Sequence, residues 1–198
     1  MRRVDPGKHE EKKRQILEAA ERCFSRDGFR GARIADICSE ADISPGHLYH
    51  YFESKEAIIA MMTDMGMERA AHRVDEMMKK PDVVAAFLAE FDYLLQRRVG
   101  RDPSLILEVI AEASRNPAIA RIVQKRSQTL QGLLAAFLRE GQERGQVDRD
   151  LDVEPAAAIL VSVIDGARAL SIKDPKFDAV TGTALLKRMV SRFLVPST

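Results

Sequence analysis

Apolar residues recur at three- and four-residue spacing along most of the chain, which is the periodicity of amphipathic helices. The sequence contains no sustained alternation of apolar and polar residues between turn residues, the pattern that predicts strands. We therefore predict an all-α protein of about nine helices joined by short connections. The predicted helices span about residues 8–27, 34–41, 45–51, 55–80, 83–99, 103 onward, 117–144, 152–171 and 178–194.

The predicted helix at residues 45–51 is short, and its start is well marked. Ser44 is a good N-cap because its hydroxyl can accept a hydrogen bond from a free backbone N–H in the next turn. Pro45 falls at the first helical position, where its missing N–H donor costs nothing. The segment carries His47 and His50 and is too short to form a core alone. A short capped helix that presents such groups and follows another helix is typical of a DNA-reading helix-turn-helix.

A longer pattern surrounds this helix, with RQILEAAERCFSRDGF at residues 14–29 and IADICSEADISPGHLYHYFESKEAI at residues 34–58. This ordered set of spacings resembles the N-terminal domain of the TetR family of transcriptional regulators. The resemblance implies a helix-turn-helix DNA-binding domain at residues 1–54 and a larger helical effector-binding and dimerisation domain at residues 55–198. It further implies a sequence-specific regulator, a ligand-responsive repressor acting as a homodimer on a palindromic operator.

The chain departs from the family pattern at three places near the helix-turn-helix, one of which is Cys38 in place of a usual Ala, a change that slightly alters the packing between helices. Ala32 and Arg33 stand where the family has a Ser or Thr cap that also binds phosphate, so we expect the Arg33 guanidinium to take over that contact. Asp42 replaces a glycine in the turn, and Asp tolerates left-handed backbone geometry better than most residues. These changes affect the expected operator sequence and leave the expected class of partner unchanged.

Docking geometry places the N-terminal end of the reading helix closest to the base edges, with position 50 one turn later on the same side. Tyr49 and Lys55 are suited to phosphate contacts, and we expect the Tyr49 ring to pack in the core with only its hydroxyl reaching out. The alternative for His50 is a solvated surface residue. The predicted DNA-binding residues are Arg33, Ser44, Pro45, Gly46, His47, Tyr49, His50 and Lys55.

Six of the eight methionines fall on the predicted helix at residues 55–80, and Met suits adaptable apolar pockets. A Met-rich stripe is also an ordinary way to build a core, and Glu112 could equally lie on a solvated face. With a small-molecule effector implied by the resemblance, the predicted ligand-binding residues are Met61, Met62, Met65, Phe87, Phe91, Leu95, Ile106, Val109, Ile110 and Glu112.

The last two long helices carry small and apolar residues that allow close helix approach. In the family, two such helices from each chain form an isologous four-helix contact. Packing within one chain explains the same pattern about as well. The predicted dimerisation residues are Ala157, Val161, Ile164, Leu185, Met189 and Phe193.

Composition and motif content limit which other classes of protein the sequence fits. The formal net charge is +1, so contact with nucleic acid must come from local charge placement such as the basic stretch at residues 2–14. The four histidines are scattered, and the sequence has neither a glycine-rich phosphate loop nor a nucleophile elbow, so we predict no enzyme, no metal and no cofactor. An apolar run of membrane length and a secretory signal are both absent, so we expect a cytoplasmic protein. An activator, a regulator without effector and a helical adaptor remain as alternatives.

Overall fold

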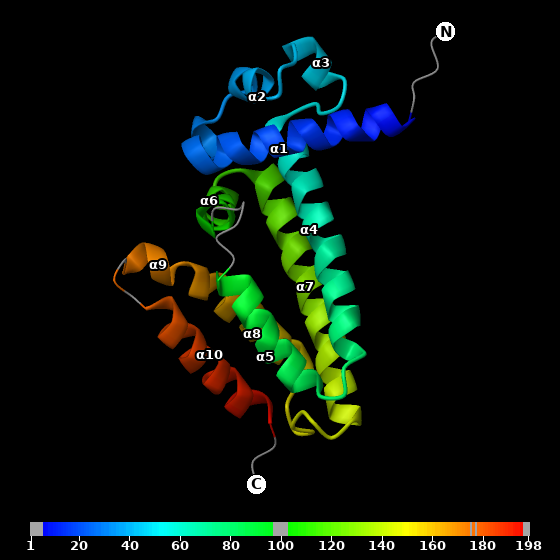
Figure 1. Cartoon of the computed structure of the whole chain (residues 1–198), viewed down its shortest axis with the longest axis vertical. Helices are drawn as coiled ribbons and strands as arrows, with labels where there is room; N and C mark the ends of the chain where they lie inside the picture. The colour runs from blue at the N-terminus through cyan, green and yellow to red at the C-terminus, as the bar shows by residue number, and fades with distance from the viewer. Residues whose placement is uncertain (1–5, 97–102, 175, 177, 196–198) are drawn as a thin grey trace.

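The computed structural model describes residues 6–96, 103–174, 176 and 178–195, and within these ranges it contains ten helices and no strand (Figure 1). The predicted all-α fold is confirmed. The helices are α1 Pro6–Gly31, α2 Ile34–Glu40, α3 Pro45–Tyr49, α4 Lys55–Met78, α5 Val83–Gln96, α6 Pro103–Ala113, α7 Pro117–Glu143, α8 Val153–Arg168, α9 Leu170–Lys173 and α10 Ala179–Leu194.

The structure has one helix more than predicted because the segment at residues 152–171 divides. The Ala169 N–H donates to the Gly166 carbonyl oxygen at 3.0 Å, a tighter turn than the α-helical pattern, and α9 follows it. The far end of the helix predicted at 83–99 lies outside the described residues. The other predicted helices are present, with ends that differ by a few residues.

Side-chain caps mark the starts of several helices, and the predicted Ser44 cap is among them. Ser44 Oγ accepts from the His47 N–H at 3.2 Å, and Ser54 Oγ accepts from the Ala57 N–H at 3.1 Å. Asn116 Oδ1 accepts from two backbone N–H groups at the start of α7. Asp42 has φ +50°, so the turn before α3 adopts the left-handed geometry expected there.

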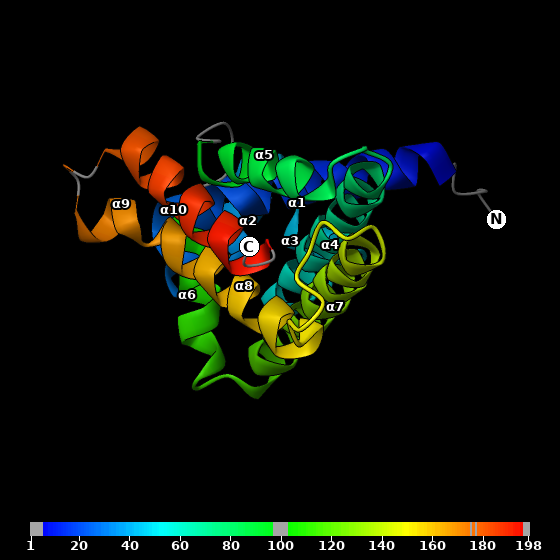
Figure 2. The same cartoon turned by 90° about the horizontal axis from the view of Figure 1, so that it is seen from below.

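The helices form two parts that share a long helix pair. Helix α1 lies across one end of the pair α4 and α7, which run in the same direction, with α2 and α3 on the other side of α1 (Figure 1). Helices α5, α8 and α10 lie beside the lower half of that pair, and the view from below shows α8 between α10 and α7 (Figure 2). Close packing joins α4 to α7, α7 to α8 and α5 to α10.

Two hydrophobic clusters correspond to these parts. The N-terminal cluster consists of buried residues of α1, α2 and α3 together with Ile58 and Ile59 of α4, Val109 of α6 and Ile119 of α7. The C-terminal cluster consists of buried residues from the second half of α4, from α5, from the second half of α7, and from α8 and α10. The predicted domain boundary at residues 54 and 55 therefore falls within a shared core, and α4 and α7 each contribute to both clusters.

Candidate DNA-binding interface and effector region

Helix α3 is anchored by one face and exposed on the other. Leu48 is fully buried, and Phe52 just beyond the helix is 4% exposed, so these two residues anchor the helix inside the protein. His47 and His50 are exposed on the outer face. A helix only five residues long keeps its position through these anchors and its Ser44 cap, because isolated helices of this length are not stable.

The start of α3 has open space in front of it. Ser44, Pro45 and Gly46 are exposed, and a Cβ added at Gly46 would meet no atom within 4 Å. The glycine is therefore not required by packing inside the protein. Arg33 is exposed at the N-cap of α2, where its backbone N–H donates to Asp36 Oδ2 at 2.9 Å. Asp36 thus supplies a local bond at the cap position that lacks a hydroxyl.

The tyrosine with a partly buried ring is Tyr51, not Tyr49 as expected from the sequence. The Tyr49 side chain is 54% exposed, so the expectation that its ring packs in the core is wrong. Tyr51 is half-buried instead, and its ring lies beside the rings of His47 and His50. Positions 47 and 51 are four residues apart, which places side chains on one face of a helical turn. That spacing is the signal that could have identified Tyr51.

Lys55 does not present its ammonium group as a phosphate ligand. Its Nζ donates to the carbonyl oxygens of Phe29 and Ala32, each at 2.8 Å, and lies 4.8 Å from the centre of the Phe29 ring. The expectation of a phosphate contact is corrected by this geometry. Lys55 instead joins the start of α4 to one carbonyl in the last turn of α1 and one just after it, because carbonyls at a helix end lack a helical partner.

Polar contacts hold α2 and the turn onto α1. Gln15 Nε2 donates to the Ala41 carbonyl oxygen at 2.9 Å, and Arg22 Nε lies 2.6 Å from Glu40 Oε1. The hydrogen bond from Arg22 is the main cause that lowers the pKa of Glu40 below its usual value. The carboxylate therefore keeps its charge, and with it the contact, to lower pH than an unpaired glutamate would.

Two carboxylates of α6 reach the end of α1. Gly28 has φ +71°, and α1 bends there. Glu108 Oε2 accepts from the Phe29 N–H at 3.0 Å, so close that a Cβ at Gly28 would lie 2.6 Å from that oxygen. Glu112, which is 7% exposed, pairs with Arg30 at 3.2 Å and Arg115 at 3.0 Å. Glu112 thus serves the junction of α1 and α6, which corrects its predicted role as a polar ligand contact.

The other predicted ligand-binding residues do not form one lining. Met61, Met62, Met65 and Val109 belong to the N-terminal cluster, whereas Phe87 and Phe91 belong to the C-terminal cluster. The Phe87 ring lies 5.4 Å from the rings of both Phe91 and Phe137, which makes it ordinary core packing. Ile106 and Ile110 are half-buried, and the side chain of Leu95 lies outside the described part of the chain.

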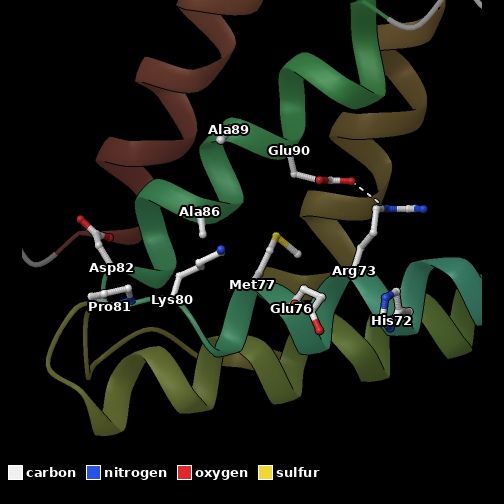
Figure 3. A pocket seen from close by; sticks show the side chains of 10 residues that line it. All are labelled: His72, Arg73, Glu76, Met77, Lys80, Pro81, Asp82, Ala86, Ala89 and Glu90. Carbon is white, nitrogen blue, oxygen red and sulfur yellow. Dashed lines mark ion pairs between the residues drawn. The ribbon is translucent and has the colours of Figure 1, made fainter.

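A groove of about 750 Å³ opens between the second half of α4 and α5 (Figure 3). Its lining residues are His72, Arg73, Glu76, Met77, Lys80, Pro81, Asp82, Ala86, Ala89 and Glu90. Arg73 and Glu90 point toward one another, with Arg73 Nε 2.7 Å from Glu90 Oε1. The two groups form an ion pair, and the buried Oε1 accepts no hydrogen bond of good geometry. Burial raises the pKa of Glu90 despite the opposing effect of Arg73.

A buried charged group links α7 to α8. Arg126, 9% exposed, donates through both terminal nitrogens to Asp165 at 3.0 and 3.1 Å, and Arg168 Nη1 donates to the same carboxylate at 2.9 Å. Burial is the main cause that lowers the pKa of Arg168.

Across the described ranges, no group of three or more His, Cys, Asp or Glu side chains is arranged to hold a metal ion. No helix in those ranges is both long and apolar enough to cross a bilayer.

The predicted dimerisation residues divide between the inside and the outside of the chain. Ala157 is fully buried and Val161 is 6% exposed, because that face of α8 packs against the C-terminal cluster, so the prediction is wrong for these two residues. Ile164 is half-buried. On α10, Leu185, Met189 and Phe193 are 60%, 50% and 40% exposed. These three residues form an apolar stripe on the outer face of α10.

Comparisons with known proteins agree with this architecture. The family model described as bacterial regulatory proteins, tetR family, matches residues 16–62, and that of the BetI-type transcriptional repressor C-terminal domain matches residues 82–195. The HTH-type transcriptional regulator UidR of Escherichia coli K12 is 32% identical over 155 residues, which cover 78% of this chain and 79% of UidR.

Two solved structures are similar over nearly the whole chain. Salmonella enterica GusR has a TM-score of 0.81 and 29% identity, covering 92% of this chain and 95% of that one. A putative transcriptional regulator from Saccharomonospora viridis in complex with choline has a TM-score of 0.79 and 26% identity, covering 95% of this chain and all of that one.

Proposed function

Because the chain belongs to the TetR family of DNA-binding transcriptional regulators, we propose that it is a homodimeric, ligand-responsive repressor whose α3 helices read a palindromic operator. The observation that carries the proposal is the outer face of α3, where His47 and His50 are exposed while Leu48 is fully buried. The two α3 helices of a dimer must then lie about 34–36 Å apart to enter successive major grooves.

Each exposed group at this surface has a proposed task. His47 and His50 contact base edges, because an imidazole can donate or accept a hydrogen bond there. Gly46 lets the backbone approach the DNA, since no atom of the protein occupies the space in front of it. Arg33 and Tyr49 contact phosphates, which positions the protein and carries no sequence information.

Selection of random duplexes by the purified protein tests this proposal. We expect enrichment of an inverted repeat, with half-sites about one DNA turn apart. His47→Ala should relax the preference at one position of each half-site. Arg33→Ala, as the matched phosphate variant, should weaken all duplexes alike and reduce the salt slope by about 1. Recovery of duplexes with no common sequence would contradict the proposal.

The proposed dimer contact is the apolar stripe of α10, formed by Leu185, Met189 and Phe193. Its exposure in a single chain supports this assignment, because contiguous exposed apolar surface marks interaction sites. Met189→Asp should convert the dimer to a monomer in sedimentation experiments and weaken operator binding. Ala184→Asp, an exposed position on the same helix but off the stripe, is the control. A Met189→Asp protein that remains dimeric would place the contact elsewhere.

The proposed effector site is the groove between α4 and α5, where Arg73 and Glu90 provide polar contacts beside the apolar Met77 and Ala86. A ligand that prefers the form unable to bind DNA would change operator affinity about 5–150-fold for a coupling of ~1–3 kcal/mol. Whether the bound form represses or activates is decided by a reporter gene with the protein present and deleted.

Filling the groove tests the effector site. Ala89 lines the groove and is exposed, so Ala89→Trp should occupy it without disturbing the core. Ala85→Trp, exposed on the same helix and outside the lining, is the matched control. Choline, the ligand of the Saccharomonospora viridis protein, is the first probe, measured by calorimetry and by its effect on operator binding. A probe that binds both variants equally well does not bind in this groove.

A further inference from the structure

We propose that Tyr51 is a positioning residue for DNA reading, which fixes the orientations of the His47 and His50 rings, and that His9 of α1 supports it. The four residues form one aromatic cluster, named here the ring cluster. The inference rests on the proposed reading role of α3, and it adds two residues that lie outside the predicted interface. The proposal concerns the ring orientations of the exposed histidines, and DNA binding itself belongs to the proposed function.

The ring cluster is centred on Tyr51. The Tyr51 ring centroid lies 5.5 Å from that of His47, 5.4 Å from that of His50 and 4.7 Å from that of His9. The His50 ring meets it edge-on at 87°, whereas the His9 ring is tilted by only 30°. These separations and angles are those at which aromatic rings attract one another. Each of the three histidine rings therefore contacts the Tyr51 ring, each in a different orientation.

Tyr51 is itself firmly placed. Its backbone N–H donates to the Leu48 carbonyl oxygen at 2.9 Å, and Leu48 is fully buried. The side chain is half-buried, in contrast to Tyr49, which is 54% exposed. Tyr51 thus forms a fixed surface at the end of α3 against which exposed rings can rest.

The orientation of the two exposed histidines matters because an imidazole reads a base only when the correct nitrogen faces it. A free surface side chain samples several rotamers, and binding must then restrict it. Contact with Tyr51 removes part of that freedom before DNA arrives, and preorganisation of this kind improves binding. The ring cluster therefore contributes to base discrimination rather than to general attraction for DNA.

His9 extends the cluster to the start of α1. It is half-buried, and its ring lies 6.3 Å from that of His50, nearly perpendicular at 85°. Lys8, Lys12 and Lys13 outnumber Glu10 and Glu11 around it in sequence, so this segment carries a small net positive charge. The same turn of α1 thus supports the reading helix through His9 and places positive charge next to it.

Substitutions at Tyr51 separate the ring from the hydroxyl. The measurement is the affinity ratio between the selected operator and duplexes changed at the positions that His47 and His50 read. Tyr51→Phe should leave the ratio within about twofold, because the ring contacts remain. Tyr51→Leu should lower the ratio by about 2- to 10-fold, the range expected for loss of aromatic pairs. Tyr49→Leu, the matched control, should weaken all duplexes and leave the ratio unchanged.

Two further variants keep the test decisive if Tyr51→Leu folds poorly. His9→Phe preserves a ring and should keep the ratio, whereas His9→Ala should lower it in the same direction as Tyr51→Leu. In a His47→Ala background, Tyr51→Leu should reduce discrimination less than in the wild type, because the His47 ring that Tyr51 positions is already absent.

Three results would overturn the proposal. The first is an equal loss in Tyr51→Phe and Tyr51→Leu with a weaker salt dependence, which would assign the hydroxyl to a phosphate. The second is an unchanged ratio in both Tyr51→Leu and His9→Ala. The third is full additivity of Tyr51→Leu and His47→Ala. A wild-type protein without sequence preference would instead contradict the proposed function, and the two failures are thereby distinguished.

Discussion

The two hydrophobic clusters are built in different ways. In the N-terminal cluster, directional contacts join the elements around the reading helix: Gln15 bonds to the Ala41 carbonyl, Lys55 to two carbonyls at the end of α1, and Glu108 to the Phe29 N–H. The C-terminal cluster is an apolar packing of long helices around residues such as Phe137, and its directional contacts lie between α7 and α8 and at the connection that follows α4. Directional bonds fix angles as well as distances. The difference is therefore one of place: at the DNA-reading end they set the orientation of short elements, whereas in the larger part they tie long helices together.

The largest test asks whether the clusters unfold together. Phe137 and Phe24 are each at most 1% exposed, one in each cluster, and truncation to Ala should cost about 3–5 kcal/mol of unfolding free energy. Because α4 and α7 contribute to both clusters, either variant should shift one common transition in chemical denaturation. Exposed Ala136→Ser should change stability by no more than about 0.5 kcal/mol. Two transitions, each moved by only one variant, would separate the clusters.

The next test concerns the junction of α1 and α6. Gly28→Ala places a side chain at φ +71° and 2.6 Å from Glu108 Oε2, so it should cost at least about 1–2 kcal/mol. In a Glu108→Ala background the close contact is removed and only the backbone cost remains. The destabilisation by Gly28→Ala, measured in denaturant, should therefore be smaller there. Equal costs in both backgrounds would show that the approach of Glu108 is readily relaxed.

Removing the cap of the reading helix has a more local effect. Ser44→Ala should cost about 1 kcal/mol, whereas Ser44→Gly should cost only a few tenths, because Gly is tolerated at N-caps. We expect operator affinity, measured by fluorescence anisotropy, to follow the same order. Similar affinities for Ser44→Ala and the wild type would mean that Leu48 and Phe52 alone hold α3.

The smallest effect is expected at the surface of the shared helix pair. Lys125 of α7 lies 2.8 Å from Asp64 of α4, and both side chains are well exposed. Asp64→Asn should lower the unfolding free energy by about 0.2–1 kcal/mol, and added salt should reduce that difference. A loss that persists in high salt would mean that the carboxylate contributes through something other than charge.

The N-terminal part was largely predictable because its signals are local. Ser44, Pro45 and Asp42 act within a few residues of their own positions, so the sequence alone indicates the turn and the start of α3. The contacts of Lys55 and Glu108 join residues far apart in the chain. No spacing rule connects such pairs, which is why a lysine that stabilises the junction looked like a phosphate ligand.

The larger part was predictable only as helices. An apolar residue at a helical position suits a core, a cavity wall or a subunit contact equally well, and burial alone decides among them. Val161 and Leu185 both fit the pattern of a contact surface, yet one is 6% exposed and the other 60%. The groove between α4 and α5 depends on how two helices diverge, which periodicity does not describe.

The continuity of α4 across both clusters has a mechanical consequence. At a rise of about 1.5 Å per residue, its 24 residues make a rod roughly 36 Å long. A rotation of about 5° around its Met78 end would carry its Lys55 end through roughly 3 Å, the length of a hydrogen bond. A lever of these proportions would withdraw His47 from a base edge while the contacts among α1, α2 and α3 stay unchanged.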